Sequence, residues 1–231
     1  MHNTQWIEER IKIAGQHFIL KRVKNLDALV DKISDELFNE DERLPYWAEL
    51  WPSAKALTEY ILQYPQKFRK KEILELGCGM GLTTMALSQL KPKSLLATDY
   101  EEAALQNAEK NFELNKISKH PDLQLLDWRK PQLDKSYDVI VASDVAYEQR
   151  FFQPLIDMFK KYLVDNGRVI LAEPNRTIAR TFFGKLALAG FDFETTDKFV
   201  VQDSKSIKVT IYEIFKLKGI AGDKIPWIDK K

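Results

Sequence analysis

The sequence predicts an α/β protein with an open, mostly parallel sheet and helices on both of its faces. Three observations predict this doubly wound class. Short apolar runs typical of buried strands alternate with amphipathic runs typical of helices along most of the chain. A turn with glycine at 77, 79 and 81 joins one such strand to the next helix. Acidic residues end several predicted strands, where open α/β sheets form their ligand crevice.

The composition limits the class of protein further. The chain has 231 residues, of which 45% are hydrophobic and 30% charged, as expected of one globular domain with an elaboration. Its 35 Lys and Arg against 34 Asp and Glu argue against the basic face that nucleic acids and anionic membranes require. The single cysteine cannot form an intrachain disulfide, and the three histidines lack metal-ligand spacing. We therefore expect a cytoplasmic monomer without metal, membrane or nucleic-acid partners.

The N-terminal part is predicted to carry a hairpin and a helix. Apolar positions on both sides of Gly15 predict two strands over residues 10–23. The charged stretch 24–44 fits either an amphipathic helix or an irregular lid. A further helix is expected to begin at Pro52 with Ser53 as N-cap, and to end before Pro65.

The rest of the chain alternates strongly between strands and helices. The predicted strands cover residues 72–76, 94–98, 123–126, 137–143 and 168–172. The predicted helices cover residues 82–90, 101–115, 152–163 and a stretch from about 178 to 190. Two last runs, 191–194 and 208–215, have no helix between them and are expected to pair as an antiparallel hairpin. We divide the chain into an N-terminal extension (1–44), a central domain (45–218) and a tail (219–231).

The turn from Glu75 to Gly81 is the most informative segment. Glycine lets the backbone turn tightly after a strand and lets a ligand approach the helix N-terminus closely. A dinucleotide-binding loop would have glycine or alanine at position 82, where this chain has Leu82, so hydride chemistry is disfavoured. A purely structural turn is the alternative.

Two further strand ends carry groups suited to a nucleoside. Asp99 ends the second strand of the central domain, where a carboxylate can accept both hydrogens of a ribose diol. Asp127 and Trp128 end the third strand and combine a carboxylate acceptor with a flat ring, which suits the amino group and the face of adenine. An exposed turn aspartate and a core tryptophan are the structural alternatives.

In these motifs the chain resembles the seven-stranded S-adenosylmethionine-dependent methyltransferases over about residues 45–217. Within that superfamily it is similar to the methyltransferase-like protein-lysine methyltransferases. The resemblance is carried by Trp51 ahead of the first sheet helix, by Asp127-Trp128, and by Asp144-x-x-Tyr147 after the fourth strand. It implies a Rossmann-like sheet of order 3-2-1-4-5-7-6 with strand 7 antiparallel, and S-adenosylmethionine as cofactor. The implied cofactor-binding residues are Trp51, Glu75, Gly77, Cys78, Gly79, Gly81, Asp99, Asp127, Trp128 and Ser143.

For catalysis we hypothesise that Asp144 holds an incoming amine and that Tyr147 supplies a ring wall and an orienting hydroxyl; Asp144 as a helix N-cap is the structural alternative.

The predicted substrate is a protein with a target lysine. A small-molecule amine or heterocycle N-methyltransferase and a cofactor-binding partner protein without activity stay open as alternatives. RNA methylation is disfavoured because the loop at 143–147 contains no proline. Glu173, Asn175 and Arg176 end the fifth strand and could also touch substrate.

Overall fold

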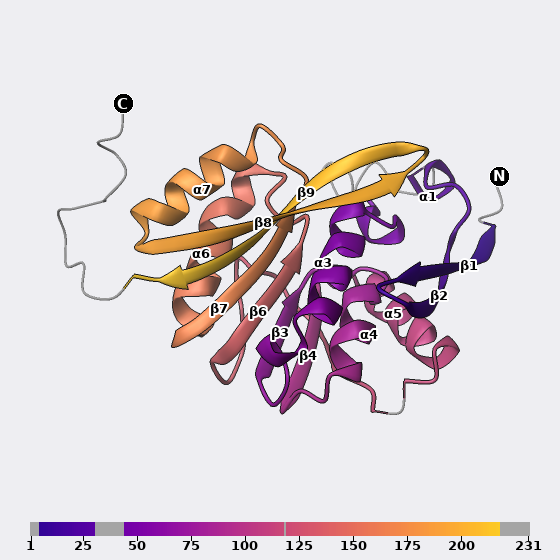
Figure 1. Cartoon of the computed structure of the whole chain (residues 1–231), viewed down its shortest axis with the longest axis horizontal. Helices are drawn as coiled ribbons and strands as arrows, with labels where there is room; N and C mark the ends of the chain where they lie inside the picture. Colours follow the sequence, from indigo (N-terminus) through magenta and orange to yellow (C-terminus); the bar gives the residue numbers. More distant parts are fainter. Residues whose placement is uncertain (1–4, 31–43, 118, 218–231) are drawn as a thin grey trace.

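The computed structural model describes residues 5–30, 44–117 and 119–217. It contains a seven-stranded sheet and a separate two-stranded hairpin (Figure 1). The hairpin strands are β1 (Trp6–Ile13) and β2 (Gln16–Val23). The strands of the large sheet are β3 (Glu72–Leu76), β4 (Ser94–Asp99), β5 (Asp122–Leu125), β6 (Tyr137–Ser143), β7 (Leu163–Glu173), β8 (Phe191–Gln202) and β9 (Lys205–Lys216).

The large sheet has the order β5-β4-β3-β6-β7-β9-β8. When the strands of the central domain are counted from β3, this is the predicted order 3-2-1-4-5-7-6. The pairs from β5 to β7 are parallel, whereas β9 runs antiparallel to both β7 and β8. The predicted fold class and the antiparallel seventh strand are therefore confirmed.

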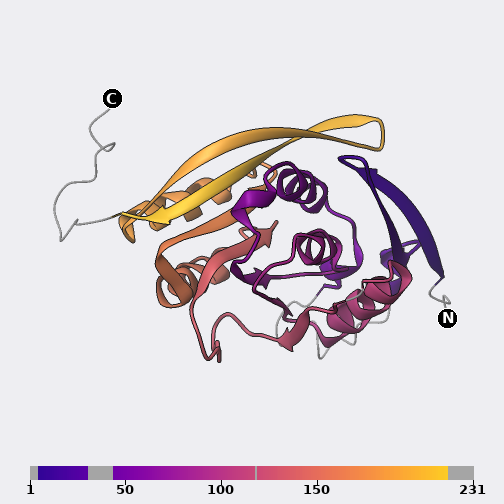
Figure 2. The ribbon, with the colours of Figure 1, turned by 60° about the horizontal axis from the view of Figure 1, so that its bottom comes forward.

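Helices cover both faces of the sheet (Figure 2). The sheet separates two clusters of buried hydrophobic residues, one under each layer of helices. One face carries α3 (Pro52–Gln63), α4 (Leu82–Gln89) and α5 (Glu102–Leu114). The other carries α6 (Phe152–Tyr162) and α7 (Ala179–Leu188). Shorter helical turns are α1 (Asp27–Val30), η1 (Tyr46–Ala48), η2 (Pro65–Lys67) and η3 (Gln149–Phe151). Because both faces are covered, the central strands are apolar along almost their whole length.

The N-terminal hairpin is fixed to α5 by three asparagine side chains, of which Asn107 donates to the carbonyl of Lys21 (3.1 Å). Asn115 accepts a hydrogen bond from the backbone N–H of Ile19 (2.8 Å), and Asn111 accepts one from Lys21 (2.7 Å). The amide of Asn111 also donates to the carbonyl of Met80 (2.9 Å), which lies in the glycine-rich turn. The hairpin, α5 and that turn are thus held together by buried polar contacts, which are costly to leave unmade.

Three details differ from the predictions. Ser53 is not the N-cap of α3, because the helix already begins at Pro52, a residue whose fixed φ suits the first helical position, and Trp51 caps it without a side-chain bond. The N-terminal hairpin is confirmed but starts earlier, at Trp6. The antiparallel pair β8–β9 is confirmed but is longer than predicted. Most of the predicted helix or lid over 24–44 lies outside the described residues. Among the helices that the structure describes, none is long and apolar enough to cross a bilayer.

Candidate active site

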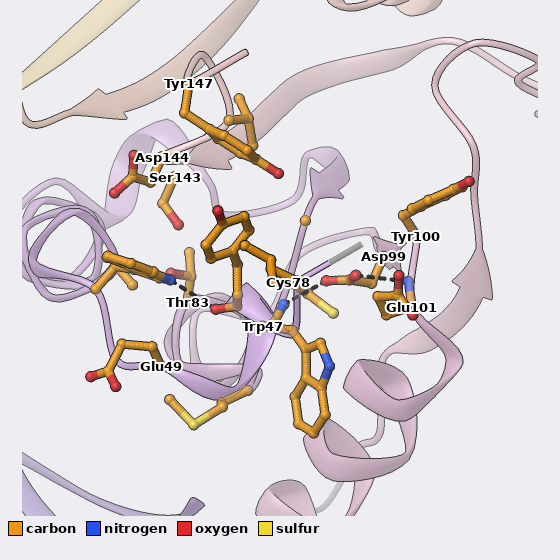
Figure 3. A pocket seen from close by; sticks show the side chains of 18 of the residues that line it. Trp47, Glu49, Cys78, Thr83, Asp99, Tyr100, Glu101, Ser143, Asp144 and Tyr147 are labelled. Atoms are coloured by element: carbon orange, nitrogen blue, oxygen red, sulfur yellow. Dashed lines mark hydrogen bonds between the residues drawn. The ribbon is translucent and has the colours of Figure 1, made fainter. Parts of the chain in front are cut away.

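A cleft opens at the carboxyl edge of the sheet, above β3, β4 and β6 (Figure 3). The cleft has a cavity volume of about 150 Å³ and is open to solvent at its mouth. Figure 3 shows Asp99, Tyr100 and Glu101 on one side of the cleft, and Ser143, Asp144 and Tyr147 on the other. The two groups come from different strands, and the parallel topology brings them to one edge.

The glycine-rich turn forms the floor between these two sides. At Gly79 the backbone has φ +51°, and an added Cβ would lie 3.4 Å from the carbonyl oxygen of Trp47. At Gly81, with φ +80°, an added Cβ would lie 2.6 Å from the Phe112 ring. At Gly79 the positive φ favours glycine and an added Cβ would make only an ordinary contact with Trp47, a cleft residue, whereas Gly81 lets α4 pack closely on α5.

Asp99 lies at the cleft, and its carboxylate is hydrogen-bonded by backbone N–H groups. Gly79 N donates to it at 2.8 Å and Glu101 N at 3.0 Å. Burial raises the pKa of Asp99 to about 6, although these N–H groups act in the opposite direction. The carboxylate is oriented by the backbone and keeps capacity to accept hydrogen bonds from a ligand diol.

Glu75 is almost fully buried beneath the cleft and is not among the lining residues. Its carboxylate accepts a hydrogen bond from the Thr84 hydroxyl at 2.5 Å. Burial raises the pKa of Glu75 to about 8, the Thr84 bond lowers it, and the charge of Asp99 adds to the rise. Asp99 thus faces this end of the cleft and Glu75 lies beneath it, with backbone N–H groups and a hydroxyl as their respective hydrogen-bond donors.

Asp127 and Trp128 separate in the structure. The Trp128 ring lines the cleft. The Asp127 carboxylate instead accepts hydrogen bonds from the backbone N and from Nε of Arg129, both at 2.9 Å, and lies outside the lining. A cofactor contact by Asp127 stays a prediction, and so do contacts by Glu75 and Gly81, which also lie outside the lining.

The opposite side of the cleft is built at the end of β6. Asp144 has φ +58°, and its backbone N–H donates to the carbonyl of Ala172 on β7 (2.9 Å). Its carboxylate forms an ion pair with Arg176, whose Nη2 lies 3.2 Å from Oδ2. Burial raises the pKa of Tyr147 above its usual range, so the phenol stays protonated and able to donate.

A row of aromatic rings borders the cleft. Tyr46 packs edge-on against Trp51, with 6.2 Å between ring centroids, and against Tyr147 at 5.6 Å. Phe151 lies 6.4 Å from Tyr147 and 5.7 Å from Trp128. The Trp51 indole N–H donates to the carbonyl of Tyr46 (2.8 Å). This wall is apolar on its ring faces and polar at its edges, which suits a ligand with a flat base or a long aliphatic chain.

The structure brings most of the predicted site residues to the cleft. Those that line it are Trp51, Gly77, Cys78, Gly79, Asp99, Trp128, Ser143, Asp144 and Tyr147. Sequence reasoning did not single out Tyr46 or Phe151, and it did not predict the pairing of Arg176 with Asp144. Tyr46 could have been found from its place in the run that ends at Trp51. Nothing in the spacing of Asp144 and Arg176 indicates their contact.

The arrangement can accommodate a cationic nucleoside. Two buried carboxyl groups, Glu75 and Asp99, and the flat indole of Trp128 lie around the glycine-rich turn. Among residues 5–30, 44–117 and 119–217 no group of three or more His, Cys, Asp or Glu side chains is arranged to hold a metal ion.

Comparison with known proteins decides the family. A family model described as lysine methyltransferase matches residues 34–189, which is more than half of the chain. The chain belongs to the lysine methyltransferase family. The matched region contains the glycine-rich turn, the aromatic wall and Asp144. The recognition made from the sequence motifs is confirmed.

Curated relatives agree with the family. Human electron transfer flavoprotein beta subunit lysine methyltransferase is 32% identical over 133 residues, covering 57% of this chain and 50% of the relative. The mouse protein-lysine methyltransferase METTL21E is 26% identical, covering 74% of this chain and 72% of its own. The chain spans about half the length of the flavoprotein beta subunit methyltransferases it matches.

Solved structures support the fold alone. Magnesium protoporphyrin IX methyltransferase from Synechocystis, solved with S-adenosylmethionine, is 17% identical with a TM-score of 0.53, covering 79% of this chain and 86% of that one. The N-methyltransferase NodS from Bradyrhizobium japonicum is 16% identical with a TM-score of 0.56, covering 71% and 98%. The family fold therefore also occurs in methyltransferases whose names indicate other substrates.

Proposed function

We propose that this member of the lysine methyltransferase family transfers a methyl group from S-adenosylmethionine to a lysine side chain of a protein. One observation carries the proposal: a single cleft is lined by Asp99 on one side, where a nucleoside would bind, and by Asp144 and Tyr147 on the other, where an amine would enter. The family match and the lysine methyltransferases among the relatives support the same reaction.

The cofactor is proposed to lie along the glycine-rich turn. Asp99 would accept the ribose hydroxyls, Trp128 would contact the adenine, and the buried carboxyl of Glu75 would favour the positive charge of the ligand from below. S-adenosylmethionine bound there would supply a methyl group, and its sulfonium sulfur would become a neutral thioether once an amine lone pair takes the methyl carbon.

The acceptor end must receive an amine and keep it neutral. A lysine with a pKa near 10.4 is about 3.4 units from neutrality at pH 7, which costs about 4 to 5 kcal/mol. Desolvation by the aromatic wall lowers that pKa, because it disfavours the charged amine. Two carboxylate oxygens have about four lone-pair sites, so Asp144 can hold the amine N–H while it also binds Arg176. The Tyr147 ring borders the path, and its hydroxyl orients the nitrogen.

Label transfer tests the proposal. The purified chain is incubated with methyl-tritiated S-adenosylmethionine and a cell extract, and labelled products are separated and mapped by mass spectrometry. We expect label on a protein band and the added mass on a lysine. Asp144→Ala is the control and should lose the label, and a melting curve checks that the variant is folded.

The other outcomes identify the alternatives. Label on small solutes would favour a small-molecule N-methyltransferase. Label nowhere, with cofactor binding intact, would favour a binding protein without activity. Either result would overturn the proposal. The monomeric state and the cytoplasmic location stay predictions.

A further inference from the structure

Arg176, in the loop between β7 and α7, lies beside the carboxylate that the proposed reaction uses. Both of its terminal nitrogens face Asp144: Nη2 lies 3.2 Å from Oδ2, and Nη1 contacts Oδ1. The Asp144 side chain is 7% exposed and the Arg176 side chain 34%. The pair is therefore only partly reached by water, and its charges are weakly screened.

The loop that carries Arg176 is itself anchored. The backbone N–H of Arg176 donates to Glu173 Oε2 at 3.0 Å, and Nη1 lies 3.7 Å from Glu173 Oε1. The Asn175 amide donates to the carbonyl of Lys208 on β9 (3.3 Å) and accepts a hydrogen bond from the Thr210 hydroxyl (3.0 Å). The guanidinium is thus fixed between two carboxyl groups.

We propose that Arg176 is a positioning residue that keeps the incoming lysine neutral, by placing a permanent cation beside the carboxylate that receives the amine. The proposal rests on the proposed function. A lysine ammonium at Asp144 would lie next to the guanidinium and be repelled, whereas the neutral amine would not. The lysine proton then leaves to solvent through the open cleft before transfer. The two-nitrogen contact also holds Asp144 in one orientation.

Other charged and titratable groups face this pair. They are Glu173 from β7 and Tyr46 from η1. Tyr147, which lines the cleft, is in turn surrounded by Glu148, Asp99 and the cation Arg150. Burial raises the pKa of Glu173 to about 7. Burial also lowers the pKa of Arg176, but a guanidinium starts so high that it stays charged. Because ionised Glu173 would favour an ammonium nearby, it acts against Arg176, and Glu173→Gln is a matched control from the same cluster.

The test is the pH dependence of kcat between pH 6 and 10. The substrate is a synthetic peptide that copies the segment around the labelled lysine, and the variants are Arg176→Gln, Arg176→Lys and Glu173→Gln. In the wild type we expect kcat to rise with pH as the bound lysine loses its proton. Arg176→Gln should move this acid limb up by about one pH unit, with KM unchanged or lower. Arg176→Lys should keep the limb near the wild-type position, and Glu173→Gln should leave it or move it down.

An unchanged limb in Arg176→Gln would overturn the inference, and so would an equal upward shift in Glu173→Gln. If Arg176→Gln does not fold, Arg176→Met takes its place, because methionine is neutral and keeps much of the length of the arginine stem. Its limb must likewise lie about one pH unit above that of the wild type. Absence of label on any protein with the wild type would overturn the proposed function itself, whereas label with an unmoved limb overturns only the role of Arg176.

Discussion

The two ends of the cleft hold their charges in different ways. At the cofactor end, Asp99 and Glu75 are buried, and their hydrogen bonds come from backbone N–H groups and a hydroxyl. At the acceptor end, Asp144 is paired with a cation of the protein itself. The hydrogen-bond donors to Asp99 and Glu75 are thus neutral, so a sulfonium ligand would bring a positive charge to them, whereas Asp144 already has a cation beside it. We therefore expect the cofactor end to attract the cationic cofactor and the acceptor end to favour the neutral form of the substrate lysine.

If the two ends are separate in function, Asp144→Ala should have the largest effect on turnover and little effect on cofactor binding. We expect kcat to fall about a hundredfold, because the amine loses the group that positions it. The dissociation constant for S-adenosylmethionine should stay within about twofold of the wild type. Steady-state kinetics and calorimetry measure the two quantities, and a comparable loss in both would break the separation.

The reverse pattern is expected for Asp99→Ala. Loss of the ribose acceptor should weaken S-adenosylmethionine binding at least tenfold, about 1.4 kcal/mol or more. At saturating cofactor, kcat should recover to near the wild-type value. Calorimetric binding equal to that of the wild type would remove Asp99 from the cofactor site.

Gly81→Ala tests whether Gly81 serves the packing of α4 on α5 while Gly79 borders the cleft. The new Cβ would meet the Phe112 ring at 2.6 Å, in a backbone conformation with φ +80°. We expect about 1 to 3 kcal/mol of lost stability, seen as a lower denaturation midpoint. Cofactor affinity of the folded variant should change less than in Gly79→Ala, where the new Cβ borders the cleft. If Gly81→Ala kept its stability and lost binding, Gly81 would be part of the cofactor site.

The last expected effect is on the pH dependence of stability and cofactor binding. In the free protein the pKa values of Asp99 and Glu75 are raised, to about 6 and about 8, so their neutral forms stabilise the fold at low pH. This contribution is lost as pH rises from the ordinary carboxyl pKa through those values, and the melting temperature of the free protein should fall between about pH 4 and 8. A cationic ligand favours the ionised forms, so binding should tighten with pH and release protons.

Calorimetry in buffers of different ionisation enthalpy measures the released protons, and melting curves measure the stability. Glu75→Gln is the control variant and should flatten the fall in melting temperature. Binding that weakens as pH rises would contradict the account of the cofactor end.

The sequence predicted the parts of the molecule that depend on local patterns. The bounds of β3 and β6 follow directly from their buried apolar runs, and Asp99 and Asp144 follow from the rule that sheet edges collect ligand groups. Ser53 was wrong as N-cap, because Pro52 can start the helix one residue earlier and the sequence does not say which of the two prevails.

Contacts between distant segments could not be predicted in this way. Arg176 reaches Asp144 only because β7 lies next to β6 and the chain turns back after Glu173, which is a property of the assembled sheet. Tyr46 similarly joins Trp51 and Tyr147 across the cleft. The different environments of Asp127 and Trp128 depend on Arg129, a neighbour whose rotamer no spacing rule fixes. Spacing therefore indicates which residues reach the edge, but not how their charges are paired there.

The most direct test of the central claim is a calorimetric titration of the purified chain with S-adenosylmethionine. We predict one saturable site per chain, with affinity lost in Asp99→Ala and retained in Asp144→Ala. Absence of binding at millimolar ligand, or equal loss in both variants, would contradict a cleft with a cofactor end and a separate acceptor end.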